Sequence, residues 1–171
     1  MRRAMHSIWQ SDFVVAQTAC LARSLKRWTG RELLPACVAG ATSSRRRPGA
    51  CEPVELAQKV YEAPFVIVSH GTEDDPILNY GNRAALALWE MTWEELTRTP
   101  SRLTAEEPNR EERARLLAAV TQHGFIDDYS GVRISKSGRR FRISRATVWN
   151  LLTADGKPCG QAAMFDRWEF I

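Results

Sequence analysis

The alternation of apolar and polar side chains after Ile126 constrains the fold most. It runs through three segments separated by the turns Lys136-Ser137-Gly138 and Ala154-Asp155-Gly156-Lys157. Alternation with a period of two is typical of β-strands, and short glycine-containing turns join antiparallel neighbours. This part of the chain therefore predicts an antiparallel meander of three long strands, the last of them over residues 161–168.

Shorter elements are predicted before the meander. Residues 9–28 carry apolar side chains at helical spacing, and Gly30 is suited to end that helix. Two runs rich in apolar and β-branched residues, 65–69 and 77–80, predict short strands.

Four further helices are expected, because their segments have caps or helical spacing. They are 53–61, 82–90 after the cap Asn82, a short one opened by the capping box of Thr92 and Glu95, and 109–123. Together these elements predict an α+β fold with a five-stranded antiparallel sheet, short helices on one face and a flanking N-terminal helix. Such a layered arrangement encloses a small pocket between sheet and helices.

The chain is expected to divide into three parts. Residues 1–35 form the N-terminal helical part, 36–52 a flexible linker or insertion, and 53–171 the α+β domain. Residues 36–52 have no hydrophobic period and are built mainly from small residues, Ser, Arg, Gly and Pro. The run Arg45-Arg46-Arg47 is interpreted as a solvated loop, with a nucleic-acid or nuclear-import patch as the alternative.

Composition and charge exclude several classes of protein. Hydrophobic residues make up 44% and charged residues 26% of the 171 residues, which excludes a wholly disordered chain. The net charge of +4 is concentrated in residues 1–50, which hold nine Lys or Arg and only two acidic residues. A basic head of this kind suits contact with nucleic acid, a membrane surface or a targeting receptor, while the body is not a nucleic-acid-binding domain.

An intracellular, cytoplasmic protein is expected, with organelle targeting by the basic N-terminus as the alternative. No apolar run reaches the roughly 18 residues of a membrane-spanning helix, so membrane insertion is not expected. The four cysteines form no C-x-x-C pair and the three histidines show no metal-ligand spacing, so no metal site is predicted.

Several phrases of the sequence resemble a known family. NYGNRAALALWEMTWEEL, over residues 79–96, resembles the PAS segment in which an Asn opens a helix after the second strand. The closer similarity is to the MEKHLA domain, a PAS-like family found at the C-terminus of plant class III homeodomain–leucine-zipper regulators and as small free-standing bacterial and algal proteins. The phrases are YEAPFVIVSHG, DPILNYGNRAAL, GFIDDYSGVRIS, GRRFRI and, for the N-terminal helix, LARSLKRWTGREL.

The resemblance implies a PAS-like sensory or protein-interaction module without catalytic activity. A small ligand would lie between the sheet and the helices, but the family supplies no settled ligand, so the cofactor is left open. The expected partners are a second copy of the chain, as a homodimer, and an unidentified signalling protein. Nothing in the chain resembles a homeodomain or a zipper, so sequence-specific DNA binding is not implied.

Arg145 and Asp128 are candidate ligand-binding residues. Arg145 shares the strand parity of Phe141, Ile143 and Trp149, so it is expected to face the helix-covered side. A buried guanidinium needs an anionic or carbonyl partner. Asp128 on the neighbouring strand can supply it, so a structural pair is expected and a receptor for an anionic ligand is the alternative.

Three further residues are candidates for ligand binding. His70 follows the first strand at the edge of the expected pocket, where a hydrogen-bonded structural histidine is the expectation and a haem ligand or pH sensor the alternative. Trp149 is a core residue or, with the other tryptophans at positions 89, 93 and 168, a platform for a planar cofactor. Gln161 enters the last strand where it can contact a polar ligand group.

No catalytic residues are predicted. Ser69 and His70 are adjacent in a strand and so point to opposite faces, and Asp127 and Asp128 share this defect. The glycines form no phosphate loop or dinucleotide motif. The stretch after the second strand lacks the reactive Cys of flavin-binding photosensory PAS domains. Two alternatives remain open: a ligand-free constitutive dimerisation module and a small enzyme with a polyketide-cyclase-like α+β fold.

Overall fold

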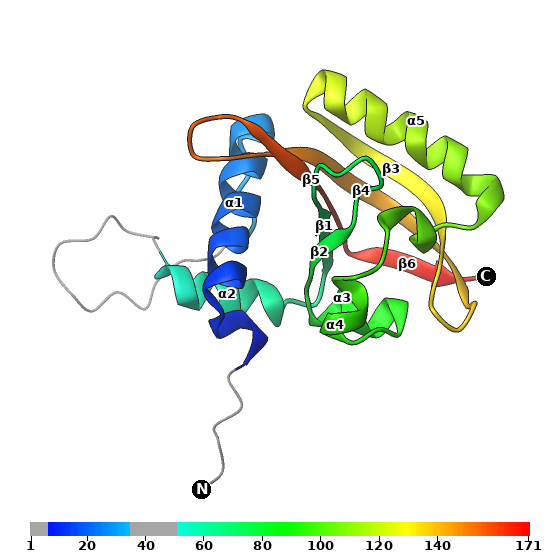
Figure 1. The fold of residues 1–171 in the computed structure, drawn as a ribbon, viewed down its shortest axis with the longest axis horizontal. Helices are drawn as coiled ribbons and strands as arrows, with labels where there is room; N and C mark the ends of the chain where they lie inside the picture. Colours follow the sequence, from blue (N-terminus) through cyan, green and yellow to red (C-terminus); the bar gives the residue numbers. More distant parts are fainter. Residues whose placement is uncertain (1–6, 35–50) are drawn as a thin grey trace, which may run out of the picture.

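The computed structural model describes residues 7–34 and 51–171 (Figure 1). The expected linker falls mainly at positions 36–50, so that prediction and the Arg45-Arg46-Arg47 run lie outside the described residues.

An N-terminal helical segment precedes the sheet. A short 3-10 turn, η1 (Ile8–Gln10), leads into α1 (Asp12–Thr29), and Gly30 ends α1 in the left-handed conformation at φ 74°. Glycine adopts this conformation without a Cβ clash, so the predicted end of the helix is confirmed. The helix α2 (Pro53–Tyr61) begins with proline in its first turn, where the missing N–H costs no hydrogen bond.

The sheet is antiparallel throughout, as predicted. Its strands are β1 (Val66–His70), β2 (Leu78–Gly81), β3 (Phe125–Ile134), β4 (Arg140–Leu152), β5 (Pro158–Phe165) and β6 (Arg167–Phe170). The order is β2-β1-β5-β4-β3, and the short β6 also pairs with β4. The pairs Thr147–Met164 and Ser144–Arg167 belong to one register, so β6 continues β5 along β4 after an interruption at Asp166.

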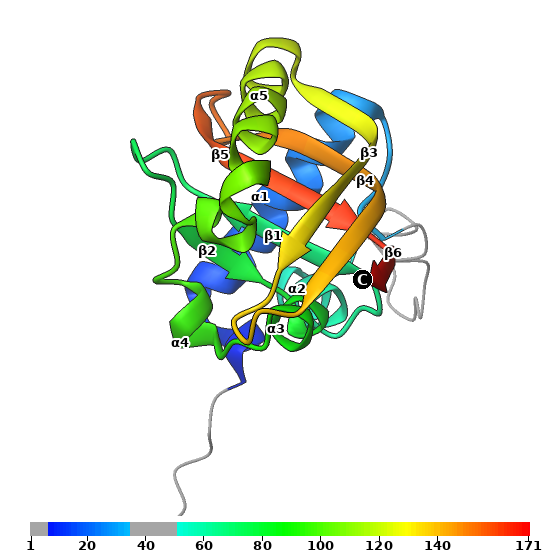
Figure 2. The same cartoon turned by 90° about the vertical axis from the view of Figure 1, so that its right-hand side faces the viewer.

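Helices cover both faces of this sheet (Figure 2). α1 packs with α2 on one face, whereas α3 (Arg83–Trp89) and α5 (Glu107–His123) lie over the other. Two short elements, α4 (Trp93–Leu96) and η2 (Ser101–Thr104), connect α3 to α5, and α4 lies against β2. The predicted α+β class, with helices on one face and a separate flanking N-terminal helix, is therefore confirmed.

Each face of the sheet has its own hydrophobic core. The core under α1 joins buried helix residues such as Val14 and Leu21 to Ile67 of β1 and Trp149 of β4. Phe13, in the first turn of α1, lies outside this core and is 51% exposed. The core under α3 contains Trp89 and Phe141. The two cores lie on opposite faces of the sheet, and β4 contributes side chains to both of them.

The alternation of β4 side chains between the two faces of the sheet is broken at Arg145. This residue is in the left-handed region at φ 54°, opposite the interruption between β5 and β6. A left-handed residue breaks the alternation of an extended strand. Ile143 and Ala146 therefore both face the α3 side, and Trp149 faces α1. The prediction that Phe141, Ile143, Arg145 and Trp149 share one face was wrong for the last two.

Candidate functional site

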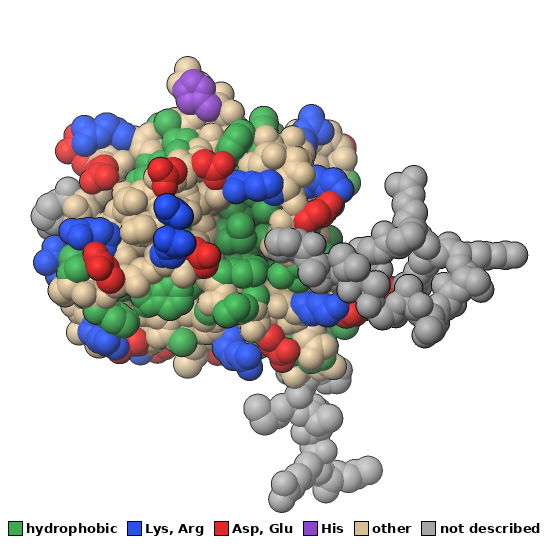
Figure 3. Space-filling view, turned by 180° about the vertical axis from the view of Figure 1, so that it is seen from behind, with side chains coloured by type: hydrophobic (Ala, Val, Ile, Leu, Met, Phe, Trp, Pro, Cys, Tyr) green, Lys and Arg blue, Asp and Glu red, His purple; other side chains and the backbone are tan. Residues whose placement is uncertain are grey.

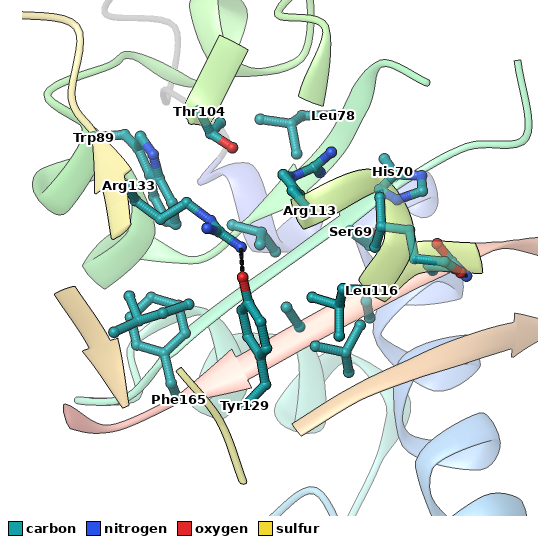
Figure 4. Close-up of a pocket in the computed structure, with 17 residues that line it drawn as sticks. Ser69, His70, Leu78, Trp89, Thr104, Arg113, Leu116, Tyr129, Arg133 and Phe165 are labelled. Carbon is teal, nitrogen blue, oxygen red and sulfur yellow. Dashed lines mark hydrogen bonds between the residues drawn. The ribbon is translucent and has the colours of Figure 1, made fainter. Parts of the chain in front are cut away.

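A cavity lies between α5 and the sheet, on the side opposite α1 (Figure 4). Its volume is about 50 Å³. It is lined mainly by apolar side chains from β1, β4, β5 and α5, with polar groups contributed by His70, Thr104, Arg113, Tyr129, Arg133 and Gln161. A mostly apolar pocket with a few convergent polar groups is the usual form of a small-molecule site.

Helix α5 contributes one stripe of side chains to the cavity. Arg113, Leu116 and Leu117 line it, and Val120 is fully buried one turn further on. These residues recur every three or four positions, so they occupy one side of the helix. The stripe thus brings a cationic side chain to a surface that is otherwise apolar.

Strand β3 contributes the second cationic group. Arg133 is only 7% exposed, and Tyr129 lies four residues before it on the same strand. The Arg133 guanidinium donates hydrogen bonds to its neighbouring carbonyl of Val132 (2.9 Å) and to the Tyr129 hydroxyl (3.3 Å). It also lies 5.4 Å from the centroid of the Tyr129 ring, a cation–π distance. None of these partners carries a negative charge.

Arg113 is close enough to Arg133 for the two charges to interact. Burial and, to a lesser extent, the Arg133 guanidinium lower the pKa of Arg113 to about 10. Among the described residues, no carboxylate forms an ion pair with either arginine, although ten other ion pairs are present. The cavity therefore carries net positive charge that the described part of the chain does not neutralise.

His70 lines the cavity, at the end of β1. It is 8% exposed, and its Nδ1 donates to the carbonyl of Gly71 at 2.8 Å, which leaves the other ring nitrogen without a proton in the neutral imidazole. That buried Nε2 has no hydrogen-bond partner. Burial lowers the pKa of His70, and the Arg113 charge lowers it further.

Gln161 also reaches the cavity, but its amide nitrogen anchors α5. It lies 3.0 Å from three acceptors that share its two N–H hydrogens: the carbonyl of Leu117, the hydroxyl of Thr121 and Oδ1 of Asn150. Its side chain therefore holds the helix against β4 and β5. The predicted contact of Gln161 with a polar group of a ligand stays a prediction.

Trp89 is the aromatic residue that combines burial with an unused donor at this site. It lines the cavity and packs edge-to-face on Phe141 and Phe165, with centroids at 5.4 and 6.2 Å. Its indole Nε1 is buried without a hydrogen-bond partner. Buried donors are nearly always satisfied in folded proteins, so this N–H is available to a bound molecule or water.

The structure places three of the predicted residues away from this cavity. Arg145 and Asp128 are both exposed, and both are left-handed, at φ 54° and 59°. No ion pair joins them among the described residues, so the expected buried pair was wrong. Trp149 is fully buried in the core under α1, with its indole nitrogen unpaired. Of the five predicted residues, only His70 and Gln161 meet at the cavity.

Arg145 borders a different hollow, on the molecular surface. Leu25, Phe65 and Met164 contribute apolar side chains to it, and Arg145 and Asp166 lie beside them. Seen from behind, this side of the molecule shows apolar side chains gathered in a depression between charged ones (Figure 3). The hollow is open to solvent, so Arg145 here needs no buried partner.

Neither a metal centre nor a membrane helix is found in the described part of the chain. Residues 7–34 and 51–171 contain no group of three or more His, Cys, Asp or Glu side chains able to hold a metal ion. In the same ranges, no helix is long and apolar enough to cross a membrane.

The fold and the position of the cavity define a PAS-like protein, and solved PAS and light–oxygen–voltage domains share this architecture. The PAS domain of a protein from Colwellia psychrerythraea is 15% identical, with a TM-score of 0.56 over 67% of this chain and 92% of that one. An RNA-binding light–oxygen–voltage receptor is 18% identical, with a TM-score of 0.59 over 75% of this chain and 36% of that one. A light–oxygen–voltage domain studied with a flavin analogue is 14% identical, with a TM-score of 0.53 over 68% of this chain and 84% of that one.

The family follows from the sequence. The MEKHLA domain matches residues 15–170, and the chain belongs to this family. No curated protein is similar enough in sequence to add to this assignment. The match includes most of α1. This helix, which contains most of the phrase LARSLKRWTGREL that resembles the family, is therefore part of the family's domain.

Four polar residues of the cavity were not predicted from the sequence: Thr104, Arg113, Tyr129 and Arg133. The position of Arg113 could have been predicted from the sequence, since it precedes Leu116, Leu117 and Val120 at helical spacing and so lies on the apolar side of that helix. No sequence pattern indicated Tyr129 and Arg133, because simple alternation along the strand places them on the face opposite Ile126. The left-handed Asp128 and the register shifts of β3 around Tyr129 change that assignment.

Proposed function

We propose that the chain is a non-catalytic sensory and protein-interaction module whose cavity between α5 and the sheet binds a small ligand. Occupancy of the cavity would alter how the domain docks on a signalling protein or on a second copy. The observation that carries this proposal is the cavity itself, where the buried polar atoms of His70 and Trp89 have no partners in the described chain. Unsatisfied buried polar groups are costly, and a ligand that pairs with them removes that cost.

The size of the cavity restricts the ligand. Drug-sized molecules and larger cofactors occupy pockets of roughly 300–1,000 Å³. The observed 50 Å³ is several-fold smaller, so the proposed ligand is a molecule of a few atoms rather than a flavin or a haem. The PAS-like fold also removes the basis for the polyketide-cyclase-like alternative.

Native mass spectrometry and ultraviolet–visible spectroscopy of the protein purified from its own host test the proposal. We expect a stoichiometric added mass and no absorption band beyond the tryptophan region. The variant Ala163→Met fills the cavity and should lose the added mass, whereas Ala118→Met, on the exposed face of α5, should keep it. A bare dimer mass for the unmodified protein would instead favour the ligand-free dimerisation module.

A further inference from the structure

The cavity contains two arginine side chains that the described chain does not neutralise. Arg113 reaches it from α5 and Arg133 from β3, so two different elements contribute a guanidinium group to the lining (Figure 4). Arg133 is almost fully buried, and Arg113 is partly buried. Two like charges in a partly desolvated space repel each other and lose hydration, so the empty state is electrostatically unfavourable.

The polar groups around these arginines are mainly donors. The indole N–H of Trp89 is unpaired, and the two guanidinium groups keep several N–H donors unused. The acidic residue types are absent from the lining. A bound group that accepts hydrogen bonds and carries negative charge would pair with the Trp89 N–H and both guanidinium groups. The Nε2 of His70, an acceptor in the neutral ring, would pair with such a group only in the protonated form of the histidine.

We propose that the cavity binds a small oxyanion of the carboxylate or phosphate type, held between Arg113 and Arg133. This inference rests on the proposed ligand-binding function and names the chemical class of its ligand. The planar fork of a guanidinium matches the oxygens of a carboxylate or phosphate, and such charge-assisted bonds are stronger than neutral ones. The apolar walls from Leu116, Leu117 and Phe165 restrict the remainder of the ligand to a short aliphatic group.

The test measures thermal unfolding and isothermal titration calorimetry with four sodium salts: acetate, pyruvate, malonate and phosphate. Sodium chloride at equal ionic strength corrects for general salt effects. We expect at least one oxyanion to raise Tm by several degrees at millimolar concentration, because a ligand that binds only the folded state stabilises it. Arg113→Met should weaken that binding by about tenfold or more, the usual effect of losing a hydrogen bond to a charged group.

Arg115→Met is the matched control on the same helix. Arg115 is 72% exposed and pairs with Glu111 at 3.6 Å on the outer surface, so its replacement should leave the affinity unchanged. A second readout separates a receptor from a structural arginine. Without oxyanion, Arg113→Met should unfold at the same or a higher temperature, since it removes an unneutralised cation; a structural arginine would give a lower Tm.

Two results would overturn the inference: none of the four oxyanions stabilises the protein, or the stabilisation is equal in Arg113→Met. If native mass spectrometry then finds a neutral ligand that Ala163→Met excludes, the proposed ligand-binding function stands and only the oxyanion class fails. If that measurement finds no ligand either, both proposals fail.

Discussion

The imidazole of His70 connects burial to the pH dependence of stability. Burial lowers its pKa below the ordinary 6.5, Arg113 acts in the same direction, and the Gly71 carbonyl and Glu73 oppose the shift. A lowered pKa means that the folded protein binds fewer protons than the unfolded chain. Its contribution to stability is therefore complete above pH 6.5 and is lost as the pH falls through the folded-state pKa.

Urea unfolding between pH 8 and 5 tests this prediction. The unfolding free energy of the unmodified protein should fall more steeply below pH 6.5 than that of His70→Gln, which has no proton to take up. His123→Gln, at the exposed end of α5, should follow the unmodified protein. Parallel curves for the unmodified protein and His70→Gln would contradict the expectation. The buffers should contain no carboxylate or phosphate, because an oxyanion beside His70 would favour its protonated form.

Asn82 does more than cap α3. It is fully buried, and its Oδ1 accepts from the backbone nitrogens of Ile67 (3.2 Å) and Ala85 (3.1 Å). Its amide nitrogen donates to the carbonyls of Phe65 (2.7 Å) and Val60 (3.3 Å). One side chain thus joins α2, β1 and α3.

Asn82→Ala should lower the unfolding free energy by about 3–5 kcal/mol, because several buried backbone groups lose their partners. Thr92→Ala removes an exposed capping box and should cost only about 1 kcal/mol. Asn82→Asp keeps the cap acceptor but loses the two donated bonds, so it should also destabilise strongly. If Asn82→Ala and Thr92→Ala cost the same in chemical denaturation, the joining role would be refuted.

The element boundaries were largely readable from local sequence signals. α2, the cap at Asn82, the capping box of Thr92 and the end of α5 at Gly124 all appear where they were predicted. Each depends on interactions within a few residues, so the local sequence contains the needed information. The face assignment along β4 was not readable, because it depends on the left-handed Arg145 in the middle of an otherwise regular strand.

The left-handed conformation of Arg145 in β4 predicts which substitutions this position tolerates. A β-branched residue tolerates its φ of 54° poorly, so Arg145→Val should cost about 1–2 kcal/mol. Arg145→Asn, which tolerates this conformation, should be close to neutral. Arg142→Val is the control: this residue is exposed in the same strand, is not in the left-handed region and makes only a surface ion pair. Equal losses of Tm for the two valine variants would contradict the role of Arg145 as the strand's turning point.

At the scale of the whole molecule, the family and fold were predictable but most of the candidate site was not. The PAS-like arrangement follows from element order and from phrases spread along the chain. The cavity instead depends on which side chains several separate elements bring together. The irregularities at Asp128 in β3 and Arg145 in β4 decide which side chains of these strands face it. His70 was found because it lies at the end of a strand that the sequence predicts, whereas Arg133 was missed because β3 changes register before it.

The two faces of the sheet are connected through Asn150 in β4. Its side-chain amide nitrogen donates to the Val120 carbonyl of α5 at 2.8 Å, and its backbone carbonyl accepts from the Trp28 indole of α1 at 2.9 Å. The Trp28 ring also packs against Gly124, where a Cβ would lie only 2.4 Å from the ring. A displacement of α5 by a ligand in the cavity can therefore reach α1 through directly contacting groups.

A double-mutant cycle with Trp28→Phe and Asn150→Ala measures this connection. The two changes should interact by about 0.5–1.5 kcal/mol in unfolding free energy, because both act on contacts of the Asn150 and Gly124 region. Trp28→Phe combined with Thr92→Ala is the control. Trp28 is at the C-terminal end of α1 and Thr92 caps α4, and Figure 1 shows these two parts far apart, so their effects should add to within about 0.5 kcal/mol. Additive effects of Trp28→Phe and Asn150→Ala would mean that α1 and α5 are stabilised independently. In that case a ligand under α5 would have to signal through another surface, such as the helix α5 itself.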